Sequence, residues 1–212
     1  MSEYVGITKI EIQRVSVVSS KPFEAVVAAI KDAVGQPDVV EFANASKRAQ
    51  TFAELKSVVQ RSLGKTGFML FMELDHGAVV RKETGMDTRK IVRLVIGNQL
   101  IMKEMAKHVP DAGSYTPVTI LVDERSDGVH LSYDRMASLL ALYGNPDALS
   151  VARDLDSKNR DTPARVCRLT EDASLPGARN PTMPMIDFYA AAGTYLFLGE
   201  LSADLPQSTA EE

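Results

Sequence analysis

The most apolar run of this chain is Gly67-Phe68-Met69-Leu70-Phe71-Met72-Glu73-Leu74-Asp75-His76-Gly77. Glycines bound the run on both sides, which gives it the length of a β-strand rather than that of a helix. Because side chains alternate across a strand, this run is apolar on both of its faces. We therefore expect residues 67–75 to form a central strand, with a pocket near its polar end.

Segments on both sides of this run carry signals of further strands and helices. Strands are predicted at 7–18, 91–96, 117–124 and 129–133, and Asp127-Gly128 predicts a hairpin between the last two. Capping residues and apolar spacing predict helices at 22–34 and 51–63, after Gly97-Asn98, and after Asn145-Pro146. Residues 36–50 are predicted to be a loop, and residues 81–85 a polar crossover.

The order of these elements predicts the fold class. Strands and helices do not alternate strictly, as they would in a parallel doubly wound fold. We expect an α+β fold with a mixed or mainly antiparallel sheet and helices packed on one face. A single domain is predicted over residues 7–158. Periodicity is lost after Lys158, so residues 159–212 are predicted to be an irregular, partly disordered tail that adds little to core stability.

The composition limits the classes of partner and the cellular compartment that we expect for this protein. A net charge of -4 over 212 residues offers no basic surface for nucleic acid. No apolar run approaches the ~20 residues of a membrane span, and residues 1–6 lack the features of a secretory signal. A single cysteine, Cys167, allows no internal disulfide. We expect a cytoplasmic protein that binds neither nucleic acid nor membrane and needs no cofactor.

Several short motifs together resemble a known family. They are Ser19-Ser20-Lys21-Pro22-Phe23, Glu73-Leu74-Asp75-His76-Gly77, Ile96-Gly97-Asn98, Asp127-Gly128-Val129-His130-Leu131-Ser132-Tyr133-Asp134 and Ala152-Arg153-Asp154-Leu155-Asp156. In combination they resemble the domain of unknown function 302 family, over residues 7–158. The resemblance implies an α+β domain, often dimeric, and no established activity. The chain departs from the family pattern at Gln99, where proline is usual, and after Lys158.

Asp75 and His76 suggest an acid–base pair at the end of the apolar run. Neighbours in a strand point to opposite faces, so the two could converge only if the strand ends or bulges between them. In the plainer interpretation Asp75 caps the next turn and His76 is a partly buried, hydrogen-bonded residue. Tyr133, whose hydroxyl must reach a partner at the sheet edge, is the third catalytic candidate. We expect His76 to line the largest pocket or a dimer contact.

Charged and polar residues on the neighbouring segments suggest a ligand site. Arg93 interrupts an apolar strand and is predicted to pair with Glu73 or Asp75, either as a structural ion pair or as part of an anion site. Asn98 follows Gly97 at a strand-to-helix turn, where it either caps the helix or offers backbone donors to an anion. The ligand-binding candidates are therefore His76, Asp75, Glu73, Arg93, Asn98 and Tyr133.

The three histidines, His76, His108 and His130, lie on separate predicted elements without metal-ligand spacing, so no metal site is expected. Three functions remain open. The first is a binding or sensor module for a small or anionic ligand. The second is a lyase, isomerase or hydrolase that uses His76 and Asp75 as acid and base. The third is an assembly protein that acts as a homodimer.

Overall fold

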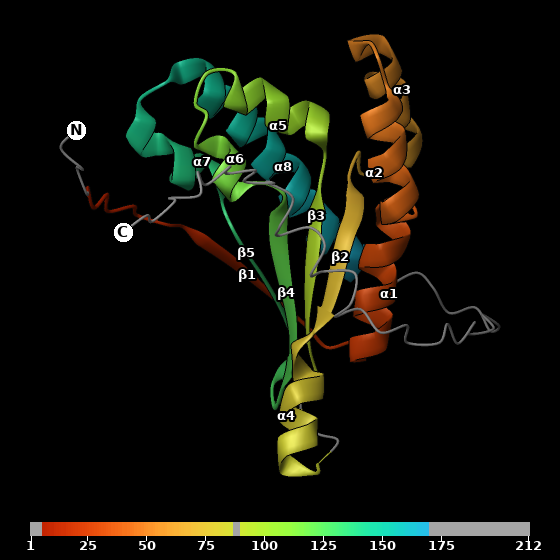
Figure 1. Ribbon diagram of the computed structural model, residues 1–212. Helices are drawn as coiled ribbons and strands as arrows, with labels where there is room; N and C mark the ends of the chain where they lie inside the picture. Colours follow the sequence, from red (N-terminus) through yellow and green to blue (C-terminus); the bar gives the residue numbers. More distant parts are fainter. Residues whose placement is uncertain (1–5, 87–89, 170–212) are drawn as a thin grey trace, which may run out of the picture. The chain divides into compact units, whose positions relative to one another are not determined.

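The computed structural model describes residues 6–86 and 90–169, with side chains as far as Asn159. The chain divides into two compact units, Met1–Ser174 and Leu175–Glu212, and all described residues belong to the first. At its centre is a five-stranded sheet in the order β1-β5-β4-β3-β2, with every pairing antiparallel (Figure 1). The strands are β1 (Arg14–Ser19), β2 (Met69–Asp75), β3 (Ile91–Gly97), β4 (Val118–Arg125) and β5 (Gly128–Asp134). The predicted α+β class is confirmed.

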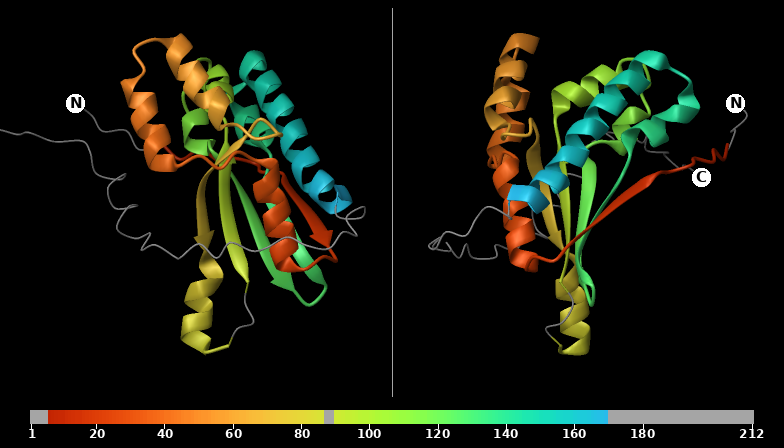
Figure 2. Two further views of the ribbon diagram at one scale, coloured as in Figure 1. Left: turned by 90° about the vertical axis from the view of Figure 1, so that its right-hand side faces the viewer. Right: turned by 180° about the vertical axis from the view of Figure 1, so that it is seen from behind.

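Two long helices, α1 (Phe23–Ala33) and α8 (Pro146–Leu169), pack on the same face of the sheet (Figure 2). Alternation along each strand supplies the apolar face that they cover. In β4, for example, Val118, Ile120 and Val122 are buried, whereas the residues between them are only partly so. Burying a side chain of this size contributes about 1.5–3 kcal/mol, which makes this layer the main source of stability.

The remaining helices lie around the sheet. A pair, α2 (Val39–Arg48) and α3 (Phe52–Ser62), builds a second cluster around Phe42, Val59 and Met69. At the end of the sheet where β3 finishes lie α5 (Gln99–Ala106), α6 (Ala112–Tyr115), α7 (Met136–Leu140) and the 3₁₀ turn η1 (Ala141–Tyr143). Helix α4 (His76–Thr84) extends from the opposite end (Figure 1). Among the described helices, none combines the length and apolarity needed to cross a membrane.

The prediction that residues 67–75 form a central strand is wrong. Strand β2 lies at the edge of the sheet and pairs only with β3 within the described strands. Both faces of β2 are apolar, and each face packs into a different hydrophobic cluster. Phe68 and Leu70 pack into the main core, whereas Met69 and Phe71 pack against α2 and α3. The backbone groups at the start of the outer edge of β2 are also hydrogen-bonded, because Gly35 donates to the carbonyl of Phe68 and accepts from the N–H of Leu70.

Two further boundaries differ from the predictions. The break expected after Lys158 is absent from the described backbone, because α8 continues to Leu169. A proline such as Pro163 removes one helical hydrogen bond, and the helix continues past it. The rest of the predicted tail, from residue 170 onward, lies outside the described residues, as does the side chain of Cys167. The first predicted strand forms paired structure only from Arg14, so residues 6–13 are unpaired in the sheet.

Candidate functional site

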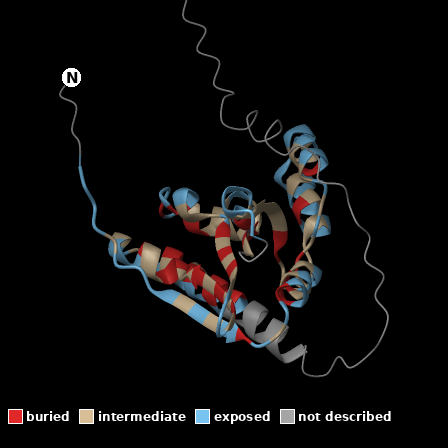
Figure 3. Cartoon of the chain, turned by 90° about the horizontal axis from the view of Figure 1, so that it is seen from below, coloured by how far each residue is buried: buried red, intermediate tan, exposed pale blue. Residues whose placement is uncertain are grey.

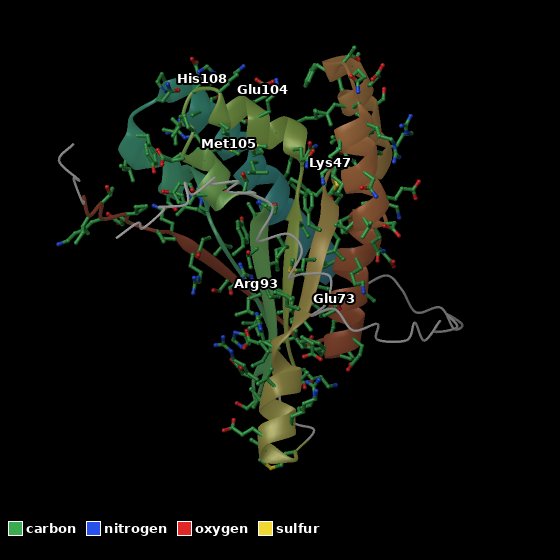
Figure 4. The ribbon with its side chains drawn as sticks, viewed as in Figure 1. Lys47, Glu73, Arg93, Glu104, Met105 and His108 are labelled. Atoms are coloured by element: carbon green, nitrogen blue, oxygen red, sulfur yellow. The ribbon has the colours of Figure 1, made fainter. Side chains whose placement is uncertain are left out.

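A cavity of about 400 Å³ lies where β2 and β3 meet α5. Its walls come from segments far apart in the sequence. They are the neighbouring strands β2 and β3, the β3–α5 turn, α5, the start of β4 with the segment before it, and α8. The described lining consists of Phe71, Met72, Val95, Gly97, Asn98, Gln99, Ile101, Met102, Met105, Thr116, Pro117, Val118 and Leu155. Met105, labelled in Figure 4, comes from α5 and is fully buried.

The shape of this cavity depends on Gly97, the last residue of β3. A Cβ atom at this position would lie 2.9 Å from the Cβ of Pro117 and 3.4 Å from the Phe71 ring. Glycine therefore allows Pro117 to approach the β3–α5 turn closely. The peptide bond between Thr116 and Pro117, next to this close contact, is cis. A larger residue at position 97 would push one wall of the cavity outward.

Asn98 holds the β3–α5 turn in place. Its Oδ1 atom accepts a hydrogen bond of 2.9 Å from the backbone N–H of Leu100, which makes Asn98 the N-cap of α5. Its Nδ2 atom donates a 2.9 Å bond to the carbonyl of Gly67, just before β2. The predicted helix cap is confirmed, and the same side chain also ties together the two strands that form one wall of the cavity.

The described lining of the cavity carries no ionisable side chain. Asn98, Gln99 and Thr116 are its polar side chains, and the hydroxyl of Thr116 already donates to the carbonyl of Ala112. The charged residues that follow Met102 in the sequence are paired with one another outside the cavity. The Glu104 carboxylate accepts hydrogen bonds from both Lys103 and Lys107. These two hydrogen bonds lower the pKa of Glu104 to about 2. The cavity is therefore suited to an uncharged, mostly apolar molecule.

A second hollow, of about 390 Å³, follows α1 and includes Glu73. Three of its charged groups, Glu24, Lys31 and Glu73, are already paired. Lys31 Nζ lies 2.7 Å from Glu73 Oε2, and Lys90 Nζ lies 2.6 Å from Glu24 Oε1. The bond from Lys90 lowers the pKa of Glu24 below its usual value. Because a ligand here would have to displace existing ion pairs, this hollow is the weaker candidate.

His76 and Asp75 lie away from both hollows. Asp75 is the N-cap of α4: its Oδ1 accepts a 2.9 Å hydrogen bond from the backbone N–H of Ala78, and its Oδ2 lies 2.6 Å from Arg81. His76 is the first residue of α4 and is exposed. The plainer interpretation of Asp75 is confirmed. His76 lines neither hollow, because the strand turns directly into a helix that leads away from them. The alternative expectation, that His76 lies at a dimer contact, stays a prediction.

The predicted ion pair of Arg93 with Glu73 or Asp75 is also wrong. Arg93 faces Leu74 in the β2–β3 register, so it projects from the opposite face to Glu73 and Asp75. Figure 4 labels Glu73 and Arg93 on these neighbouring strands. Arg93 is exposed and donates a 3.1 Å hydrogen bond to Thr119 Oγ1. Both carboxylates have found other partners, Lys31 and Arg81.

Tyr133 is buried, and its hydroxyl donates to the carbonyl of Asp156 at 3.5 Å. It therefore ties β5 to α8 and lies apart from the described lining of the cavity. Of the six ligand-binding candidates, Asn98 alone belongs to that lining, and Glu73 belongs to the second hollow. Within the described residues, no group of three or more His, Cys, Asp or Glu side chains could hold a metal ion.

Sequence reasoning missed most of the cavity. None of its three methionines, Met72, Met102 and Met105, was among the candidate residues, although methionine is common in adaptable binding surfaces. Their signal was the i, i+3 spacing of Met102 and Met105 directly after Gly97-Asn98. The contributions of Pro117 and Leu155 could not be found from sequence, because they depend on how β4 and α8 pack against α5.

The structure is an antiparallel α+β domain with an apolar cavity at one end of β3. A family model described as "Domain of unknown function DUF302" matches residues 42–162, and the chain belongs to this family. The chain is similar in fold to the crystal structure of the uncharacterized conserved protein DUF302 from Bacillus stearothermophilus. That match has 12% sequence identity and a TM-score of 0.51, and covers 72% of this chain and 97% of the other. No curated protein matches the chain.

Proposed function

We propose that this protein is a small-molecule-binding module whose ligand occupies the cavity between β2, β3 and α5. The observation that carries the proposal is the cavity itself, about 400 Å³ in volume and lined by apolar side chains with a few polar groups. This volume and lining are typical of sites for small organic ligands. The three methionines of the lining provide flexible, polarisable walls that adapt to the shape of a ligand.

The ligand class follows from the charges of the site. Burying an ion without a counter-charge is costly, and the described lining supplies no counter-charge. The module should therefore select uncharged molecules over acids or amines with the same apolar body. The polar end of such a ligand would lie near Gln99, whose side chain has no described hydrogen bond in the structure.

This arrangement favours binding over acid–base catalysis. General acid–base chemistry needs a titratable group within hydrogen-bond reach of the reacting atom. His76 and Asp75 do not line the cavity, and the described lining contains no histidine, carboxylate, lysine, cysteine or tyrosine. The cavity therefore lacks the acid and the base that the enzyme hypothesis requires.

A pair of fluorescent probes tests the proposal. One is an uncharged phenylnaphthylamine, and the other carries a sulfonate on the same ring system. The chain contains no tryptophan, so protein emission does not interfere with either measurement. We expect the uncharged probe to bind at least tenfold more tightly, because desolvating the sulfonate in this lining is uncompensated.

Substitution of Met102 locates the probe. Met102→Lys places a cation in the lining and should reverse the preference toward the sulfonated probe. Leu142→Lys is the matched control, since Leu142 is exposed on η1 and does not line the cavity. Equal binding of the two probes to the wild-type chain, or an equal effect of both substitutions, would contradict the proposal.

A further inference from the structure

The sheet has a second face, opposite the one that α1 and α8 cover. Figure 1 is viewed toward this face, and no described helix lies across its centre. Along β4 and β5, buried residues alternate with half-buried ones, and the half-buried set points to this second face (Figure 3). Strand pairing aligns one row of it across the whole sheet: Leu74, Arg93, Leu121, Ser132 and Ser16. We call the surface around this row the open face.

The middle of the open face is apolar around one arginine. Leu74 and Leu121 flank Arg93 on the two neighbouring strands. Ile91 and Val95 flank it along β3, on the same face. All four apolar residues are half-buried, and none belongs to either hydrophobic cluster of the described chain. Apolar surface that the core does not use is a feature of interaction sites.

The charge of Arg93 has no described carboxylate partner. Arg93 donates one hydrogen bond, to Thr119 Oγ1, and its remaining donors have no partner among the described residues. A guanidinium has five N–H donors arranged to bind a carboxylate through two parallel hydrogen bonds. The other charged groups on the strands of this face are paired, namely Arg14 with Asp134, Arg125 with Asp123 and His130 with Asp127.

We propose that the open face binds a protein partner that presents one carboxylate between apolar side chains, with Arg93 as its anchor. An arginine surrounded by apolar residues is typical of the centre of a protein interface. A single unpaired cation suits a single carboxylate, whereas nucleic acid and anionic membranes are held by many cations. Neither of the two hollows includes Arg93, and small-molecule sites are concave.

The dimensions of the open face indicate how tightly it binds. Five strands of six to eight residues give a flat area of roughly 400 Å², from the ordinary spacing and rise of strands. A stable protein interface buries about 800 Å² on each partner. The open face alone therefore suits a weak complex that exchanges rapidly. The proposal goes beyond the cavity and does not depend on a ligand there.

An NMR titration with capped peptides tests the proposal under conditions that detect weak binding. The probe peptide has one glutamate between two leucines, and the control peptide has glutamine in its place. The glutamate peptide should shift the Arg93 Nε–Hε signal and the methyl signals of Leu74 and Leu121 to saturation. The methyl signals of Leu142, exposed on η1, should stay fixed. The glutamine peptide should bind roughly fivefold more weakly.

Substitution of Arg93 assigns the preference to its charge. Arg93→Met keeps the apolar stem and should abolish the preference for glutamate over glutamine. Arg93→Glu reverses the charge and should make a lysine-centred peptide the tightest of the three. Arg48→Met is the matched control, because it removes an exposed arginine on α2, and it should leave the preference unchanged.

Four results would overturn the proposal. The first is the absence of any shift with the glutamate peptide at millimolar concentration, and the second is a glutamate preference that survives Arg93→Met. The third is free N-acetylglutamate binding as tightly as the peptide, which would show a small-anion site. The fourth is a shift of the Leu74 and Leu121 signals with protein concentration alone, which would show that a second copy of this chain covers the face.

Discussion

Asp156 of α8 is the buried carboxylate whose removal should cost most among the described polar contacts. Its side chain is almost fully buried and accepts two hydrogen bonds from the first turn of α7, 2.8 Å from the backbone N–H of Met136 and 3.0 Å from that of Ala137. It therefore caps α7 from another helix, and its backbone carbonyl accepts from Tyr133. This arrangement fastens α7 to α8.

Asp156→Ala should destabilise the fold by about 2–4 kcal/mol. Loss of a helix cap costs ~1 kcal/mol. Leaving a second buried N–H without an acceptor costs about 1–3 kcal/mol more. The nearby Arg135, 3.6 Å away and partly exposed, adds little. Asp156→Asn keeps one acceptor oxygen and should lose less than Asp156→Ala.

Urea unfolding followed by far-ultraviolet circular dichroism measures this difference. Asp154→Ala is the matched control, because Asp154 is exposed on the same helix and its replacement should change stability by less than about 0.5 kcal/mol. A loss below about 1 kcal/mol for Asp156→Ala, or one equal to the control, would refute the capping argument.

The pH dependence of the same proteins gives a second test. Burial raises the pKa of Asp156 above 3.8. The hydrogen bonds from the Ala137 and Met136 backbone and the positive charge of Arg135 lower the pKa, but the effect of burial is larger. The folded state therefore holds this proton more tightly than the unfolded state, so ionisation of Asp156 subtracts stability. The stability of wild type relative to Asp156→Asn should be greatest below pH 3.8. It should fall as the pH rises through the raised pKa.

Three further outcomes follow from other contacts. The hydrogen bond between the Tyr115 and Tyr143 hydroxyls, whose oxygens lie 2.8 Å apart, raises the pKa of Tyr143 to about 12, so Tyr115→Phe should move the ultraviolet titration of Tyr143 back toward 10. Arg93→Met should change the free energy of unfolding by less than about 0.5 kcal/mol, because it leaves no carboxylate unpaired; a loss of several kcal/mol would show a buried partner. His76→Gln should leave the affinity for the uncharged probe unchanged within twofold, and a tenfold loss would place His76 in the site.

Local signals in the sequence predicted local structure well. Capping residues predicted a helix over 51–63, and α3 does begin after Thr51, whose hydroxyl oxygen accepts a 3.2 Å hydrogen bond from the Glu54 backbone. The Glu54 carboxylate in turn accepts a hydrogen bond from the backbone N–H of Gln50. Helix α4 had comparable signals, with Asp75 as N-cap and Gly85 in the left-handed conformation after its last turn. It was missed because the polar residues before Gly85 were interpreted as a crossover.

Strand order and the cavity could not be predicted, because both depend on contacts between distant segments. An apolar pattern on both faces predicts that a strand is covered, but not by which elements. In β2 the cover comes from α2 and α3, and α2 lies in a region that was predicted to be a loop. The cavity likewise requires Pro117 and Leu155 to approach α5, a packing that no local pattern encodes.

Methyl NMR of methionine is the measurement that tests the central claim most directly. Met72, Met102 and Met105 belong to the described lining of the cavity, whereas Met86 is exposed and Met136 is buried elsewhere in the core. On titration with an uncharged aliphatic alcohol, the signals of the three lining methyl groups should shift together and saturate, while those of Met86 and Met136 stay fixed. The carboxylic acid of the same chain length should produce much smaller shifts. Saturating shifts at Met86 or Met136 without shifts at Met102 and Met105, or an equal response to alcohol and acid, would contradict an uncharged ligand in this cavity.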